Sequence, residues 1–110
     1  VVDFAGEVTA SALFRSYSDA CGDPDAYATS HIGWGMNPGA RWDTMPLYDR
    51  SQTNGTEQRA FAGNFLYSTG ANEHAGRHTL GHFDLPMRNH TVALDGDPVV
   101  IEGVLQGDLA

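Results

Sequence analysis

The sequence predicts an α+β fold that consists mostly of antiparallel or mixed β-strands, with a short helix near its N-terminal end. Apolar residues recur at helical spacing between residues 9 and 20. Several later segments alternate apolar and polar side chains or are rich in aromatic residues, and turns containing Gly, Pro or Asn separate them. A chain of 110 residues has room for one domain, which we expect to span residues 1–110.

The helix is expected over residues 9–20, where Leu13, Phe14 and Tyr17 share one face and Gly22 follows the last turn. After the helix, strands are expected over residues 25–32, 58–68, around His82, and over residues 91–94 and 99–101.

The first of these strands alternates along its length, and the second is rich in Phe, Tyr and Leu. The last two flank Asp95-Gly96-Asp97-Pro98, which predicts a hairpin. Residues 41–48 contain Pro46 and are expected to be irregular with one helical turn, and the polar, Gly-rich residues 70–81 are expected to form a loop.

Composition narrows the range of functions. Fourteen acidic residues against six basic ones give a net charge of -8, and no basic stripe is present, so nucleic acid is not an expected partner. No apolar run reaches the ~20 residues that cross a bilayer, and no secretory signal is present in the sequence given. Cys21 is the single cysteine, which excludes an internal disulfide and fits a cytoplasmic protein.

The sequence begins at Val1-Val2-Asp3-Phe4, in the middle of an apolar pattern. We therefore expect the chain to be a fragment of a longer one.

The strongest chemical signal is His82-Phe83-Asp84, because a strand directs the side chains of His82 and Asp84 to the same face. This pair is half of a metal site, and a second His would complete the two-His-one-carboxylate set of non-haem Fe(II) oxygenases. The alternative is a solvated pair of strand residues without a metal. His31 is ambiguous by itself and can equally be a structural histidine.

The other histidines are weaker candidates for metal ligands. His78 and His82 are four residues apart, but Gly76 and Gly81 argue against the helix that a zinc pair would need. His74 is expected to be exposed in a loop, and His90 is expected to be structural. The sequence contains neither a Gly-rich phosphate loop nor a Gly-x-Ser-x-Gly elbow.

From Ser30 to Val104 the order of motifs resembles the C-terminal part of the leucyl aminopeptidase T-like superfamily, which implies that fold for this chain. The motifs that carry the resemblance are residues 31–38, 55–64 and 68–72 and the triplet His82-Phe83-Asp84. In the superfamily's metallo-aminopeptidases the first motif begins with a Glu ligand and the second carries a His ligand. Here His31 and Arg59 stand at those places, which argues against a two-zinc peptidase site.

The substitutions instead resemble the 2,5-dihydroxypyridine 5,6-dioxygenase branch of the superfamily. This resemblance implies a mononuclear Fe(II) centre held, in chain order, by His31, Ser68, His82 and Asp84. It also implies extradiol-like cleavage of a dihydroxylated pyridine in nicotinate or nicotine catabolism, with both atoms of dioxygen entering the product.

Further expectations follow from the resemblance. The partners are a small aromatic substrate and dioxygen, the longer protein forms a homo-oligomer, and the catalytic base lies in an N-terminal region outside this chain. Trp34, Phe65 and Phe83 alternate with or adjoin the predicted ligands, so they are candidate walls of the substrate pocket or, alternatively, core residues. Candidate partners of the metal-binding imidazoles are Asn37, Asn64, Asn72 and Glu73.

Two other functions stay open at this point. A metallo-aminopeptidase would hydrolyse peptides with zinc or cobalt. A non-catalytic domain would bind metal for structure or assembly, and chelation would then lower its thermal stability without any turnover.

Overall fold

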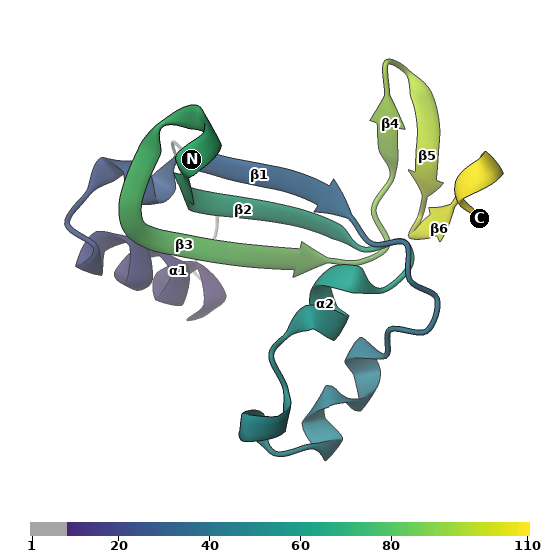
Figure 1. Cartoon of the computed structure of the whole chain (residues 1–110), viewed down its shortest axis with the longest axis horizontal. Coiled ribbons are helices and arrows are strands. Elements are labelled where there is room, and N and C mark those ends of the chain that lie inside the picture. The colour runs from purple at the N-terminus through teal and green to yellow at the C-terminus, as the bar shows by residue number, and fades with distance from the viewer. Residues whose placement is uncertain (1–8) are drawn as a thin grey trace. The chain divides into compact units, whose positions relative to one another are not determined.

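The computed structural model describes residues 9–110 (Figure 1). The opening Val1-Val2-Asp3-Phe4 lies outside the described residues. The chain divides into two compact units. Of the described residues, unit 1 comprises 9–31 and 67–85, and unit 2 comprises 32–66 and 86–110.

Unit 1 begins with helix α1, Thr9–Ala20, as the apolar spacing predicts. A short 3₁₀-helix, Pro24–Tyr27, follows and occupies the first half of the predicted strand 25–32. The prediction was wrong there because the Asp23 side chain accepts a hydrogen bond from the backbone N–H of Asp25, which starts a helical turn with proline in its first position. Strand β1 then begins at Thr29 and ends at Trp34.

Strand β1 forms a three-stranded sheet with β2, Phe65–Asn72, and β3, Arg77–Met87. The strand β2 lies in the middle and runs antiparallel to both neighbours (Figure 1). A 3₁₀-turn, Glu73–Ala75, joins β2 to β3. The predicted loop over residues 70–81 is therefore mostly strand, because sheet pairing rather than an apolar pattern orders this polar segment.

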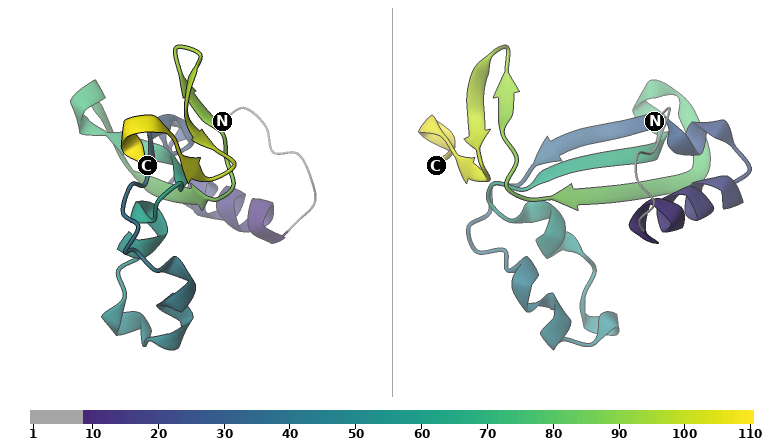
Figure 2. Two further views of the ribbon diagram at one scale, coloured as in Figure 1. Left: turned by 90° about the vertical axis from the view of Figure 1, so that its right-hand side faces the viewer. Right: turned by 180° about the vertical axis from the view of Figure 1, so that it is seen from behind.

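Helix α1 packs against one face of this sheet (Figure 2). The ring of Phe83 meets those of Phe14 and Tyr17 edge-on, with both centroid distances at 5.1 Å. The Tyr17 hydroxyl also accepts a hydrogen bond from the backbone N–H of His82 at 3.0 Å and donates one to its carbonyl at 2.9 Å. The helix thus fixes the backbone of β3 at His82.

Two glycines allow close contacts with β3: Gly70 lets β2 approach it, and Gly81 lets the segment between α1 and β1 approach it. Gly70 has φ +98, and a Cβ there would lie 1.9 Å from the carbonyl oxygen of Gly81. A Cβ on Gly81 would lie 2.6 Å from the Cβ of Ala26. Only glycine fits this contact, which lies two residues after Ser68 and one residue before His82.

Unit 2 contains a second three-stranded sheet, in the order β4-β5-β6. Its helices and strands are the 3₁₀-helices Trp42–Leu47, Arg50–Gln52 and Gly107–Leu109, helix α2 at Thr56–Ala60, and strands β4 at Val92–Leu94, β5 at Asp97–Ile101 and β6 at Val104–Leu105. The predicted hairpin is confirmed, since β4 and β5 pair antiparallel with Leu94 opposite Asp97.

The predicted strand 58–68 is wrong over its first half. Helix α2 occupies residues up to Ala60. Its N-cap is Gly55, with φ +78, and in the turn before the helix the Asn54 side chain accepts a hydrogen bond from the Thr56 N–H. Phe65 then opens β2.

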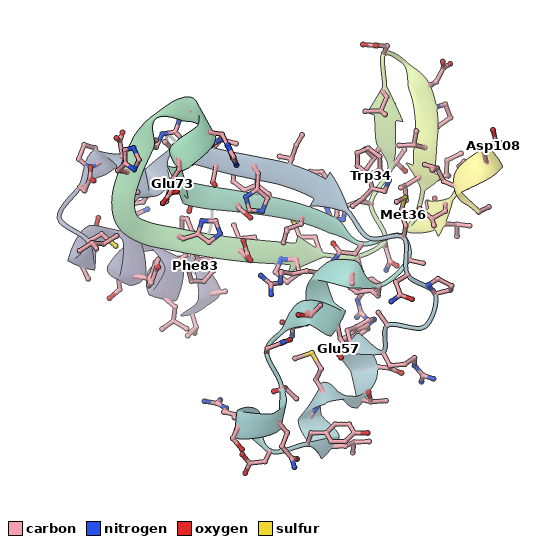
Figure 3. The ribbon with its side chains drawn as sticks, in the orientation of Figure 1. Trp34, Met36, Glu57, Glu73, Phe83 and Asp108 are labelled. Atoms are coloured by element: carbon pink, nitrogen blue, oxygen red, sulfur yellow. The ribbon has the colours of Figure 1, made fainter. Side chains whose placement is uncertain are left out.

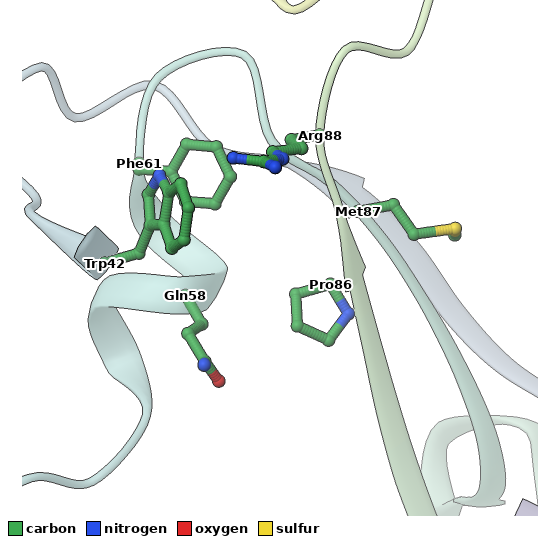
Figure 4. A pocket seen from close by; sticks show the side chains of 6 residues that line it. All are labelled: Trp42, Gln58, Phe61, Pro86, Met87 and Arg88. Carbon is green, nitrogen blue, oxygen red and sulfur yellow. The ribbon is translucent and has the colours of Figure 1, made fainter. Parts of the chain in front are cut away.

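Unit 2 also has a cavity of about 310 Å³ (Figure 4). Its lining residues are Trp42, Gln58, Phe61, Pro86, Met87 and Arg88. The guanidinium of Arg88 lies 5.0 Å from the centroid of the Trp42 ring, a cation–π contact that stabilises this wall. None of the site residues predicted from the sequence lines the cavity.

The buried apolar side chains are few among the described residues: Phe14, Ala26, Leu66 and Val100. Large apolar side chains are exposed in both units, with Leu80 at 93% and Leu47 at 81%. The helices described over residues 9–110 include none with the length and apolar character to cross a membrane.

Candidate metal centre

The predicted donors come from three neighbouring strands, and all four belong to unit 1. His31 lies on β1, Ser68 on the central strand β2, and His82 and Asp84 on β3. The two-residue period of a strand places His82 and Asp84 on the same face. Because β2 lies between the other strands, Ser68 can reach side chains on both of them.

The structure brings all four side chains together. Ser68 Oγ lies 3.0 Å from His31 Nε2 and donates a hydrogen bond of 2.5 Å to Asp84 Oδ1. His82 Nε2 is 3.3 Å from Asp84 Oδ1, and His31 Nε2 is 3.9 Å from the same oxygen. The imidazole rings of His31 and His82 are stacked, with centroids 5.5 Å apart.

These distances fit a single metal ion. Donors at about 2.1 Å from an ion and at right angles to each other lie about 3 Å apart. One ligand atom from each of His31, His82 and Asp84 fits within a span of 4.8 Å. Two imidazoles and one carboxylate are the donors that non-haem iron prefers, and the Ser68 hydroxyl can add a fourth oxygen.

One side of the site is open. The side chains of His31 and His82 are 48% and 43% exposed, and that of Asp84 is 20% exposed. Ser68 is fully buried. The inner side of the cluster therefore consists of the buried Ser68 and the partly buried Asp84, and the two histidines form an accessible rim.

Sequence reasoning missed Ser30, which precedes His31 in β1 and is buried. Its Oγ lies 3.3 Å from His31 Nδ1 and donates a hydrogen bond to the backbone carbonyl of Ala71. Asn72, one of the candidate partners, donates to the Ser30 carbonyl at 2.7 Å. No sequence signal distinguishes this serine, since its role depends on a contact with β2, 41 residues further along the chain.

The predicted substrate residues lie in different surroundings. Phe83 points toward α1 (Figure 3), from the strand position between His82 and Asp84. This gives Phe83 a packing role. In unit 2, Phe65 stacks on His90 with centroids 5.6 Å apart. Trp34 has a buried Nε1 without a hydrogen-bond partner among residues 9–110. The substrate contacts of all three stay predictions.

The remaining histidines, His74, His78 and His90, lie outside the cluster of predicted donors. His74 and His78 are exposed, as the loop composition led us to expect for His74. The Nδ1 of His90 lies 2.9 Å from the backbone carbonyl of Arg88 in unit 2. Across the described part of the chain, His31, His82 and Asp84 are the one group of three or more His, Cys, Asp or Glu residues with this geometry.

Comparison with known proteins gives a consistent result. The family model described as NicX, 2,5-dihydroxypyridine 5,6-dioxygenase, matches residues 1–107. A 2,5-dihydroxypyridine 5,6-dioxygenase of Pseudomonas putida KT2440 is 46% identical over 91 residues, which are 81% of this chain and 26% of that protein.

A solved structure of the 2,5-dihydroxypyridine dioxygenase from Pseudomonas putida KT2440 superposes with a TM-score of 0.86 at 38% identity. The superposition covers 99% of this chain and 32% of the solved chain. This chain thus spans between a quarter and a third of the length of the relatives that it matches. On the residues matched and the shared fold, the chain belongs to the 2,5-dihydroxypyridine 5,6-dioxygenase family.

Proposed function

We propose that this chain is the metal-binding portion of a longer Fe(II)-dependent, extradiol-like dioxygenase that cleaves the ring of a dihydroxylated pyridine, with 2,5-dihydroxypyridine as the expected substrate. The observation that carries the proposal is the convergence of His31, Ser68, His82 and Asp84, in a chain of this family. The partners are the aromatic substrate and dioxygen, and the setting is the catabolism of nicotinate or related pyridines.

The four donors are the residues that would hold the iron. Their mixture of nitrogen and oxygen atoms suits a divalent first-row metal, and iron is the one whose chemistry matches a dioxygenase. When bound, Fe(II) supplies the electron transfer that lets dioxygen react with an electron-rich ring. The chain's own residues supply the positions of the donors, one negative charge from Asp84, and the open rim.

Ser68 and Asp84 form the rigid part of the proposed centre. Ser68 is buried and directs its hydroxyl hydrogen at Asp84 Oδ1, so it holds that carboxylate in one orientation. The exposed histidine rim leaves room for a small planar ligand to approach. The base that removes a substrate proton belongs, in this proposal, to the part of the longer protein outside this chain.

Three broader features complete the proposal. The fold is that of the C-terminal part of the leucyl aminopeptidase T-like superfamily, with residues 1–110 acting as one metal-binding domain. The longer protein is a cytoplasmic homo-oligomer. Trp34, Phe65 and Phe83 are the residues whose alanine variants we would examine for changes in KM.

The test uses the full-length enzyme, reconstituted anaerobically with Fe(II) and mixed with 2,5-dihydroxypyridine in aerated buffer. We expect about one iron per chain by elemental analysis, one O2 consumed per ring cleaved, and loss of the substrate's ultraviolet absorption. A protein that binds no iron would contradict the proposal. Peptide hydrolysis with zinc or cobalt would favour the aminopeptidase instead, and chelation that lowers Tm in a protein without turnover would favour a structural metal site.

A further inference from the structure

We propose that Ser30 is a positioning residue, which fixes both the ring orientation and the tautomer of His31 in the metal centre. The inference rests on the proposed function, because it assumes that His31 Nε2 binds the metal. The structure places Ser30 Oγ 3.3 Å from His31 Nδ1, the ring nitrogen that does not face the other donors.

Counting hydrogens gives the direction of this contact. A serine hydroxyl has one hydrogen and two lone pairs. The hydrogen of Ser30 Oγ is used on the carbonyl oxygen of Ala71, so toward His31 the oxygen can only accept. When a metal binds at Nε2, in place of the contact with Ser68 Oγ, the hydrogen of His31 is on Nδ1, where Ser30 Oγ accepts it.

Ser30 is itself held firmly in place. Its side chain is 8% exposed, and its carbonyl accepts a hydrogen bond of 2.7 Å from the Asn72 side chain. The guanidinium of Arg77 donates to the neighbouring Thr29 carbonyl at 2.6 Å. Asn72 is the last residue of β2, and Arg77 is the first residue of β3. The oxygen that meets His31 is thus fixed by contacts from two other strands.

The two histidines of the site are held in different ways. The backbone of His82 is fixed on both its N–H and its carbonyl by the Tyr17 hydroxyl. Within residues 9–110, Nδ1 of His82 has no hydrogen-bond partner, whereas Nδ1 of His31 has Ser30. The His31 side chain is 48% exposed, and its ring stacks on His82 and contacts Ser68 through Nε2. The contact with Ser30 restrains the opposite edge of the ring, at Nδ1.

The experiment compares Ser30→Thr with Ser30→Val in the full-length enzyme, since the two side chains have the same shape and differ in the hydroxyl. Affinity for Fe(II) is measured anaerobically by competition with a chromophoric chelator, and the d–d absorption of the Co(II) form reports the ligand geometry. We expect S30V to bind Fe(II) about 10–100-fold more weakly and to have an altered Co(II) spectrum, while S30T stays close to the unmodified enzyme.

Thr69→Val is the matched control. Thr69 is fully buried in the neighbouring strand, and its Oγ1 has no hydrogen-bond partner among the described residues, so T69V should leave metal affinity unchanged. Equal Fe(II) affinity and Co(II) spectra in S30V and S30T would overturn the role of Ser30 and leave the proposed function intact. An unmodified enzyme that binds no Fe(II) would instead overturn the proposed function. Melting of the metal-free variants separates a loss of folding from a loss of metal binding.

Discussion

At the scale of single residues, the site centres on one oxygen atom. Asp84 Oδ1 accepts the hydroxyl hydrogen of Ser68 and lies within 3.9 Å of the Nε2 atoms of both His31 and His82. The Asp84 carboxylate lies close to the side chains of the other three predicted ligands, and it also supplies the negative charge that a divalent cation needs. We therefore expect Asp84 to contribute more to metal affinity than any of the other three residues.

Asp84→Asn tests this expectation, because it keeps the size of the side chain and removes its charge. We expect Fe(II) affinity of the full-length enzyme to fall by about 100-fold or more, beyond the effect typical of residues that only orient a ligand. Asp97→Asn, an exposed change at the start of β5, should leave affinity unchanged. Chelator competition measures both variants, and an affinity within threefold of the unmodified enzyme for D84N would contradict the assignment.

At the scale of elements, the site depends on how closely β2 and β3 approach. The close approach of Gly70 to Gly81 lies beside both Ser68 and His82. It therefore fixes the spacing between these two predicted donors. Helix α1 adds a second restraint through Tyr17 and Phe83. Gly70, Gly81 and helix α1 therefore hold the geometry of the candidate site without contributing a donor.

Gly70→Ala should separate the two strands. A Cβ at this position would lie 1.9 Å from a backbone carbonyl, and φ +98 disfavours any residue other than glycine. We expect a loss of stability of about 3 kcal/mol or more, above the usual cost of overpacking, together with weaker Fe(II) binding. Thermal melting and chelator competition on the full-length enzyme measure the two effects.

Gly33→Ala is the control for this variant. Gly33 also lies in a strand of the same sheet, but a Cβ there meets nothing within 4 Å. The Tm of the Gly33→Ala variant should stay within a few degrees of that of the unmodified enzyme. Similar losses in both variants would show that the close approach of the strands is not the cause.

The success of the sequence predictions also differs between elements. Helix α1 and the β4–β5 hairpin were predicted well, because their signals are local: an apolar stripe of period 3.6, and turn residues between two apolar runs. The polar start of β3 and the residues of α2 were assigned wrongly. The structure of β3 depends on sheet pairing, and that of α2 follows the turn at Asn54 and Gly55; neither gives an apolar period.

At the scale of the whole molecule, the described residues bury few large apolar side chains and expose many. The most exposed in unit 1 are Leu13 at 65% and Leu80 at 93%, and in unit 2 Leu47 at 81%. Exposed apolar side chains that lie together mark surfaces that pack against something else. Since the relatives are about three times as long, we propose that the remainder of the longer protein covers part of this surface.

A comparison of residues 1–110 alone with the full-length enzyme tests the last proposal. At equal molar concentration, we expect the isolated 110 residues to enhance the fluorescence of ANS more strongly and to elute partly as aggregates, because the exposed leucines lack their cover. Fluorescence and size-exclusion chromatography make the comparison. A monomeric fragment with no more ANS fluorescence than the full-length enzyme would show that these side chains are exposed in the longer protein too.

The sequence by itself determined the chemical identity of the candidate donors, their order along the chain, and the shared face of His82 and Asp84. These features are local, and the two-residue period of a strand fixes the last one. Only the tertiary structure decided that His31 and Ser68 lie next to His82 and Asp84. It also decided that Ser30 contacts Nδ1 of His31. The reason is that these contacts depend on strand register. Register is set by backbone pairing between strands and by the close approach of Gly70 to Gly81, and no local pattern in the sequence encodes either of them.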